Sequence, residues 1–471
     1  MMRSLYAGVA GLKTHQTRMD VIGNNIANVN TTAYKSQSMT FSDLMYQTTQ
    51  AASGANATTG VGGTNARQIG LGSKTSAIKT AITQQGATQT TNDPFDVMIT
   101  GESFFIVNNG SENFFTRDGS FYVDGAGNLA MTSTGYNVMG WLPDTDDPTT
   151  IKQDTVTALR VMTEANMTYP AEATSQATFA GIIDTNDTNV TSNEGRVVNL
   201  EVYDNKGFKY TVRCSLHDAD TSADDGVFFL QIDDILDTNG KSIVEAGKAI
   251  TEYVNFAGAN GAAVSGPTAP NGEPTAYLRY STKDGSFLNV GAGANDTTQQ
   301  STIIFDFNQD NLPSFDDITA DFSATSNQNN NGSSTFVGSK GDTKGNGSGR
   351  KVGEMSGIAI QKDGKIYASY DNGQKRLLGQ IAVANFANAS GLSKEGDNLY
   401  SATQNSGDFN GVGEDITANG GYMNSGVLEM SNVDLSAEFT EMITTQRGFQ
   451  ANSRIITVSD TLLEELTNLK R

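Results

Sequence analysis

Apolar side chains recur every seven residues near both ends of the chain. A step of seven residues places side chains on one stripe of a helix, the pattern of coiled-coil seams and bundle faces. The pattern predicts a helical inner assembly domain formed by residues 1–30 and 430–471. The side chains predicted at its interface are Leu5, Leu12, Met19, Ile26, Leu435, Met442, Phe449, Ile456 and Leu463.

Two amides, Asn24 and Asn25, lie beside the N-terminal stripe and are included in the predicted interface. Amides next to an apolar seam can form hydrogen bonds between helices and fix their register. A solvated helix face is equally compatible with the pattern, so both interpretations stay open. Residues 1–40 carry a net charge of +3 and residues 428–471 a net charge of −3. Opposite charges favour pairing of the two segments, within one subunit or between neighbours.

The middle of the chain changes character in steps. Residues 31–75 are rich in Thr, Ser, Gly, Asn and Gln, and indicate an extended connector. Short alternating runs between turn signals indicate antiparallel strands over 76–150 and again over 351–429, which together form one discontinuous β domain. The acidic insertion at 151–350 predicts an outer β domain, with one or two subdomains, and its low-complexity end (326–350) predicts a mobile exposed loop. The expected fold class is therefore mainly β with terminal α-helical, coiled-coil-like segments, in nested discontinuous domains.

Charge limits the partners that the chain can have. The 471 residues include 31 Lys and Arg against 52 Asp and Glu, a net charge of −21. Nucleic acids and anionic membrane surfaces require a basic footprint, so we expect neither as a main partner. No stretch approaches the roughly 18 apolar residues of a membrane helix, and the N-terminal segment lacks the apolar core of a cleaved signal peptide. Membrane insertion is therefore not expected, and export would use a route without a cleaved signal.

Catalytic and cofactor motifs are not recognisable in the sequence. Cys214 is the only cysteine, which excludes an internal disulfide framework and a cysteine-based zinc site. His15 and His217 are the only histidines, which argues against most histidine-based catalysis. We therefore expect a protein that is not an enzyme and holds no cofactor.

One segment partly matches a calcium-binding loop. Asp306, Asn308 and Asp310 supply oxygen ligands at the first, third and fifth positions of such a loop. Asn311 stands where the loop needs glycine, and Asp317 stands where it needs glutamate. Because Asp and Asn clusters in acidic β proteins are usually solvated turns, calcium is the weaker interpretation and no metal site is predicted.

Both ends of the chain resemble the signatures of bacterial flagellar axial proteins. The N-terminal signature runs from Ser4 to Lys35, SLYAGVAGLKTHQTRMDVIGNNIANVNTTAYK, and the C-terminal one from Ser425 to Leu466. PFDVMITGESFFIV at 94–107 resembles the first half of the β domain shared by hook and distal-rod proteins. The segment at 363–392 resembles the second half of that domain as it occurs in the hook protein. Its sequence is DGKIYASYDNGQKRLLGQIAVANFANASGL.

The resemblance implies a flagellar hook protein, whose copies stack into a curved tube that transmits torque from the motor and rod to the filament. It places the terminal helices in inner layers around a channel and the β domains outside them. The implied partners are other copies of the chain, the distal rod and hook–filament junction proteins, the hook cap during assembly and the flagellar type III export apparatus. The implied location is the hook, outside the cell after export.

Two alternatives to a hook protein remain. A distal-rod protein with an unusual insertion would share most of these features but form a straight tube. A secreted binding or adhesive protein would act through the insertion at 151–350.

The resemblance also raises a covalent link, because some spirochaete hooks are cross-linked between a cysteine and a lysine of neighbouring subunits. Cys214 lies in no matching motif, so a buried unreactive thiol is the favoured interpretation.

Overall fold

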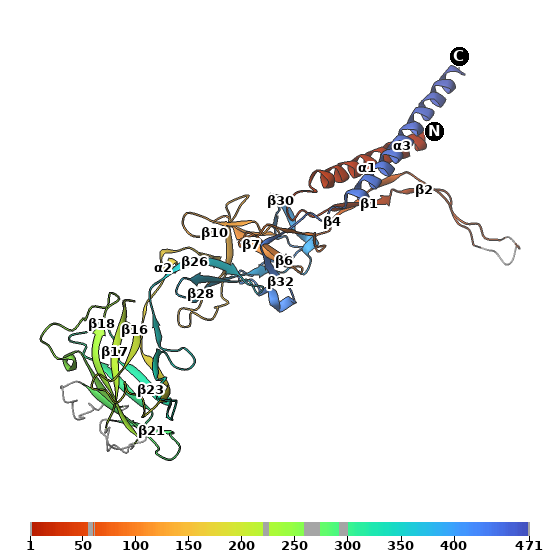
Figure 1. Cartoon of the computed structure of the whole chain (residues 1–471). Coiled ribbons are helices and arrows are strands. Elements are labelled where there is room, and N and C mark those ends of the chain that lie inside the picture. The colour runs from red at the N-terminus through yellow and green to blue at the C-terminus, as the bar shows by residue number, and fades with distance from the viewer. Residues whose placement is uncertain are drawn as a thin grey trace. The chain divides into compact units, whose positions relative to one another are not determined.

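The computed structural model describes residues 2–54, 60, 62–219, 226–258, 274–291 and 300–469. The chain divides into two compact units (Figure 1). The first unit comprises Met1–Asn166, Gly357–Ser369 and Lys375–Arg471, and the second comprises Met167–Ser356 and Tyr370–Gln374. Strands hold 42% of the residues and helices 17%, so the predicted class, mainly β with helical ends, is confirmed.

Helix α1 (Met2–Ala27) and helix α3 (Leu435–Asn468) pack side by side in the first unit (Figure 1). They run antiparallel, because Ser4 lies near Ser459 while Arg18 pairs with Glu441. Asp434 begins α3 by accepting hydrogen bonds from the backbone N–H groups of Ser436 and Ala437, which would otherwise have no partner within the helix.

Part of residues 31–75, expected as an extended connector, forms two-stranded ribbons, the first strand of which begins at Gln37. Strand β1 (Gln37–Asp43) pairs antiparallel with β4 (Ser73–Thr80), and β2 (Tyr46–Gln50) pairs antiparallel with β3 (Arg67–Gly70). Both faces of β2 and β3 are exposed, so these strands need no alternating apolar positions and leave no strand pattern in the sequence.

The β domain of the first unit joins segments from both sides of the insertion. Its largest sheet follows the strand order β27–β28–β11–β7–β8–β31–β30. Phe104, Phe115, Trp141 and Tyr400 share its core, and the Trp141 indole N–H donates to the backbone carbonyls of Asp154 and Val412. The strands of this domain are β5 (Thr88–Thr90), β6 (Val97–Thr100), β7 (Phe104–Asn108), β8 (Asn113–Thr116), β9 (Phe121–Val123), β10 (Leu129–Met131), β11 (Asn137–Trp141), β12 (Thr157–Ala158), β27 (Lys365–Tyr370), β28 (Lys375–Ile381), β29 (Val383–Ala384), β30 (Ser393–Gly396), β31 (Leu399–Ser401), β32 (Tyr422–Ser425) and β33 (Val427–Glu429).

The second unit is a sandwich of two five-stranded sheets. One sheet has the order β19–β22–β23–β15–β24 and the other β16–β17–β18–β20–β21. Apolar side chains of both sheets, such as Phe179, Leu200 and Phe305, belong to one continuous core. The ten strands are β15 (Gln176–Ile183), β16 (Arg196–Tyr203), β17 (Lys209–Asp218), β18 (Val227–Leu236), β19 (Val254–Gly258), β20 (Thr275–Tyr280), β21 (Phe287–Gly291), β22 (Thr302–Phe307), β23 (Ile318–Asn327) and β24 (Val337–Lys340).

Short elements complete the described chain. Four are strands and four are helical turns. The turns labelled η are 3-10 helices. They are α2 (Glu164–Met167), β13 (Thr168–Tyr169), β14 (Glu172–Thr174), η1 (Ile250–Glu252), β25 (Ser348–Arg350), β26 (Gly353–Ile360), η2 (Ala389–Gly391) and η3 (Ile416–Asn419).

Two buried carboxylates hold part of the segment predicted as a mobile loop at 326–350. Asp184 Oδ2 accepts hydrogen bonds from the backbone N–H groups of Asn330 (2.6 Å) and Gly332 (2.8 Å), and Asp187 Oδ2 accepts one from Ser334 (2.9 Å). Burial alone would raise the pKa of Asp184, but its backbone N–H donors outweigh burial and hold the pKa below the usual value. Composition could not reveal these contacts, because they come from carboxylates about 150 residues away.

Asp184→Asn is expected to release this segment. A neutral amide loses the charge-assisted hydrogen bonds, each worth about 1.5–3 kcal/mol, so amide exchange at Asn330 and Gly332 should accelerate by roughly 10- to 100-fold. Because the folded pKa of Asp184 is depressed, its stabilisation is present above about pH 4 and is lost as the pH falls through the folded pKa. Hydrogen exchange read by NMR checks this, with Asp342→Asn in an exposed turn as the control. Unchanged protection in Asp184→Asn would contradict the assignment.

Candidate assembly interface

Helices α1 and α3 approach each other closely because glycines line their contact. A Cβ atom added at Gly8 would lie 3.2 Å from Ile456 Cγ1. One added at Gly11 would lie 2.7 Å from Asn452 Nδ2, and one at Gly448 would lie 2.6 Å from His15 Cε1. Missing side chains therefore set the spacing of this helix pair.

The predicted seven-residue stripes do not form the most buried part of this contact, although Ile456 lies against Gly8. The most buried positions of α1 are Gly8, Gly11, Thr14, Val21, Ile22 and Asn25. Helix α1 contacts both α3 and the β1–β4 ribbon, so its buried surface is wider than one stripe. Among the stripe positions, Leu435 is exposed. The other eight are half-buried, namely Leu5, Leu12, Met19, Ile26, Met442, Phe449, Ile456 and Leu463.

The two predicted amides lie at the C-terminal end of α1. Asn25 Nδ2 donates to Glu438 Oε1 of α3 (2.8 Å) and to the backbone carbonyl of Gln37 (2.8 Å). Asn24 Nδ2 donates to the Tyr34 hydroxyl (3.2 Å). Burial raises the pKa of Glu438, and the bond from Asn25 opposes that rise. Asn25 thus joins α1, α3 and the start of the ribbon.

Arg18 and His15 join α1 to the ribbon and to α3. The Arg18 guanidinium pairs with Glu441 of α3 (3.0 Å) and lies over the Phe41 ring of β1 (5.3 Å). The His15 ring lies 5.6 Å from the Phe41 ring and beside Gly448. Burial, followed by the Arg18 charge, lowers the pKa of His15 and favours its neutral form. The contact between the helices therefore includes polar groups as well as apolar ones.

Gly448→Ala is expected to weaken the helix pair, against the usual effect of this substitution. Replacing a helical glycine with alanine normally stabilises by about 0.5–1 kcal/mol. At Gly448 the new Cβ meets the His15 ring, whereas at Gly23 it meets no atom within 4 Å. Thermal unfolding followed by circular dichroism should therefore show a lower midpoint for Gly448→Ala and a higher one for Gly23→Ala. Equal stabilisation by both substitutions would contradict the close packing of the helices.

A buried ion triad lies where both helices meet the β domain. Glu429 Oε1 lies 2.7 Å from Lys35 Nζ, and Glu429 Oε2 lies 3.3 Å from Arg117 Nε. All three side chains are at most 1% exposed. Burial lowers the pKa of Lys35, and the Glu429 carboxylate opposes that shift. The triad thus links the segment after α1, the segment before α3 and the β domain.

Backbone carbonyls complete the triad. Arg117 Nη1 donates to the carbonyls of Gly101 (2.7 Å) and Ser103 (2.6 Å), and Lys35 Nζ donates to that of Gln84 (2.7 Å). Sequence reasoning missed this site, because no local pattern connects charged residues that are 312 or 394 positions apart.

Both helices expose large apolar side chains. At 100° per residue, Leu435, Phe439 and Ile443 lie on one flank of α3, while Val458 and Leu462 lie on another. Surfaces of this kind on a soluble chain mark contacts with other proteins. The exposed set on α1 and α3, with Leu469 directly after α3, is Tyr6, Val9, Leu435, Phe439, Ile443, Ile455, Val458, Leu462, Leu466 and Leu469.

In the calcium candidate, the Asn308 side chain forms hydrogen bonds within the protein. Asn308 Nδ2 donates to the backbone carbonyl of Glu252 (2.9 Å), and Asn308 Oδ1 accepts from the backbone N–H of Asp310 (3.0 Å). Burial, followed by repulsion from Asp317, raises the pKa of Asp306. Within the described ranges, no three or more His, Cys, Asp or Glu side chains are grouped so that they could hold a metal ion.

Cys214 lies on β17 inside the core of the second unit. Its side chain is completely buried, and burial raises the pKa of its thiol. A thiol with a raised pKa and no access to solvent is a poor nucleophile. This placement supports the interpretation of Cys214 as an unreactive core residue.

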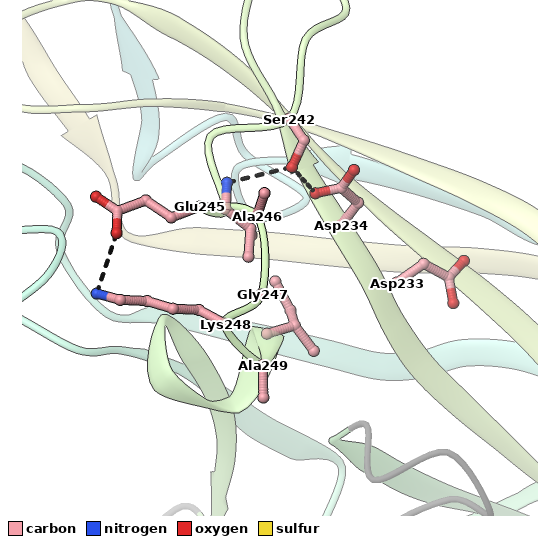
Figure 2. A pocket seen from close by; sticks show the side chains of 10 residues that line it. Asp233, Asp234, Ser242, Glu245, Ala246, Gly247, Lys248 and Ala249 are labelled. Atoms are coloured by element: carbon pink, nitrogen blue, oxygen red, sulfur yellow. Dashed lines mark hydrogen bonds and ion pairs between the residues drawn. The ribbon is translucent and has the colours of Figure 1, made fainter.

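Polar side chains also line a hollow of about 360 Å³ in the second unit (Figure 2). Ser242 Oγ donates to Asp234 Oδ1 (2.6 Å), and Lys248 pairs with Glu245 (3.4 Å). Asp233 Oδ1 accepts a hydrogen bond from Ser215 Oγ (2.8 Å). Each of these polar groups thus has a partner within the protein. Among the helices of the described chain, none has the length and apolar character needed to cross a membrane.

Three family models match the chain. The "Flagella basal body rod protein" model matches residues 5–35, the "Flagellar hook protein FlgE/F/G D1 domain" model residues 98–177, and the "Flagellar basal body rod FlgEFG protein C-terminal" model residues 424–469.

Full-length relatives also match. The flagellar hook protein of Treponema pallidum is 34% identical over 483 residues and covers 100% of both chains. A flagellar basal-body rod protein of Bacillus subtilis is 28% identical over 471 residues, again covering 100% of both. The crystal structure of a Helicobacter pylori flagellar hook protein is similar with a TM-score of 0.42 at 12% identity, and covers 73% of this chain and 100% of that one.

Proposed function

Because the chain belongs to the flagellar hook protein family, we propose that it is built into the flagellar hook through its two terminal helices. It is a structural subunit of the hook, and therefore part of a polymer that contacts other flagellar components. The observation that carries the proposed mode of assembly is the apolar surface that α1 and α3 expose in a single chain. Burying such surface between copies would supply strong contacts.

The assembly surface that we propose combines two sets of residues. The first set consists of the exposed apolar side chains of α1 and α3. The second set consists of the predicted stripe and amide positions, namely Leu5, Leu12, Met19, Ile26, Asn24, Asn25, Leu435, Met442, Phe449, Ile456 and Leu463. The exposed apolar side chains, Leu435 among them, would contact other copies directly. The remaining stripe and amide positions would hold α1 and α3 in the shape that those copies recognise.

The β units would form the outer layers of a curved tube that transmits torque. Their surfaces are rich in Asn, Thr, Ser and Asp, whose contacts with neighbours can be exchanged through water at little cost. Membership of the family supports four further partners: the distal rod, the hook–filament junction proteins, the hook cap and the type III export apparatus. It also supports a location outside the cell, reached by that export route.

The tube's shape separates the hook from the rod alternative. The rod-protein relative in Bacillus subtilis is less similar than the Treponema hook protein, so the distal-rod alternative is the less supported one. Negative-stain electron microscopy of the full-length chain at rising concentration is expected to show curved tubes. Straight rods would favour the distal-rod function. Monomers at all concentrations would contradict assembly by this chain alone.

We do not propose an adhesive function, because the polar groups of the hollow in Figure 2 bind one another.

A further inference from the structure

The β domain of the first unit has an apolar groove that its own side chains leave open. The groove has a volume of about 460 Å³, and its apolar lining consists of Leu142, Pro143, Pro148 and the two buried residues Leu377 and Leu378 of β28. Leu142 is 43% exposed, and Met162, close to the groove in sequence, is 38% exposed. Apolar side chains at this degree of exposure are suited to contact with another protein.

Two guanidinium groups lie in the lining of the groove. Arg160 Nε donates to Asn128 Oδ1 (3.1 Å), and Arg376 Nη1 donates to the backbone carbonyl of Ala165 (3.0 Å). Among the described residues, neither guanidinium forms an ion pair with a carboxylate. Asp144 is the one acidic residue in the lining of the groove. Each guanidinium keeps further N–H donors for a partner.

The charge of the whole chain identifies the kind of partner. Each copy carries a net charge of −21, so two copies repel each other wherever their surfaces meet without local compensation. Unpaired arginines beside an apolar groove supply that compensation. A carboxylate that approaches a guanidinium can form two parallel hydrogen bonds, which adds direction to the attraction.

We propose that this groove receives an acidic segment of a second copy of the chain. Apolar side chains of the segment pack against Leu142, and its carboxylates pair with Arg160 and Arg376. This inference rests on the proposed function, because the polymer is what brings the copies together. It adds a contact between β domains and neighbouring copies to the helix contacts proposed above.

Cross-linking in the assembled polymer tests which chain occupies the groove. The photoreactive residue p-benzoyl-phenylalanine replaces Leu142 in the full-length protein, and the same residue at Tyr122, exposed on β9, is the control. Polymers are grown from equal amounts of ¹⁵N-labelled and unlabelled protein, so that mass spectrometry separates links between copies from links within one copy. We expect links from position 142 to acidic peptides of a second copy, at least fivefold more often than from position 122. Links within one copy only, or no excess over position 122, would overturn the proposal.

Charge reversal tests the two arginines. Arg160→Glu combined with Arg376→Glu is expected to raise the protein concentration needed for polymerisation about tenfold. The charge-matched control, Lys283→Glu with Lys344→Glu in exposed turns of the second unit, should change it less than twofold. Unchanged fluorescence of Trp141 would show that the β domain is still folded. Equal polymerisation of both double variants would overturn the groove proposal alone. A wild-type chain that never polymerises would contradict the proposed function, and with it this inference.

Discussion

Glu429→Ala is expected to destabilise the first unit by about 3–5 kcal/mol. The substitution removes the carboxylate shared by Lys35 and Arg117 while both cations stay buried. Removing one partner of a buried ion pair is costly because the remaining charge has lost its solvation by water and its counter-charge together. In this triad one carboxylate serves two cations, which places the expected loss at the upper end of that range.

Urea unfolding followed by tryptophan fluorescence measures this effect in one unit. Trp141 is the only tryptophan of the chain and is buried in the first unit, so its signal reports that unit. Glu441→Ala is the matched control. It breaks the Arg18–Glu441 pair, whose side chains are 27% and 52% exposed, and should cost no more than about 1 kcal/mol. If the two variants unfolded at the same urea concentration, the triad would have no special role in stability.

Leu462→Asp is expected to raise the concentration needed for polymerisation at least tenfold while leaving the folded monomer intact. Leu462 is 45% exposed on α3, so a single copy gains little stability from it. If a second copy buries this side chain, the contact is worth about 1.5–3 kcal/mol, and every 1.4 kcal/mol corresponds to a factor of ten in affinity. Aspartate would also place a charge in that contact, which increases the loss.

Thr461→Asp is the control for this prediction. It adds the same charge one position earlier, on an exposed face about 100° away around α3. Sedimentation of polymer across a concentration series should place Thr461→Asp close to wild type and Leu462→Asp far above it. A Leu462→Asp chain that sediments like wild type would show that this flank of α3 lies outside the assembly contacts.

The sequence was sufficient to predict the terminal helices and the strands of the interrupted β domain. Their apolar side chains recur at helical or alternating spacing, and local periodicity is the strongest signal that a single sequence carries. Family resemblance added the hook function, which the comparison with full-length relatives confirms.

Other features could not be predicted, because long-range contacts determine them. The glycines at 8, 11 and 448 define the contact between α1 and α3, yet a search for apolar residues passes over them. Lys35 and Glu429 are far apart in sequence, and each looks like an ordinary surface charge until the chain folds. The β2–β3 ribbon has both faces exposed, so its composition resembles that of a connector.

We propose that α1 and α3 build the inside of the hook and carry its assembly contacts. Helical reconstruction of the polymerised full-length chain by electron cryomicroscopy tests it most directly. We expect α1 and α3 at the smallest radius, with exposed side chains of α3 such as Phe439 and Leu462 against neighbouring copies. Residues 167–356 are expected at the largest radius. A tube whose copies meet only through β units, with both helices facing solvent, would contradict this proposal.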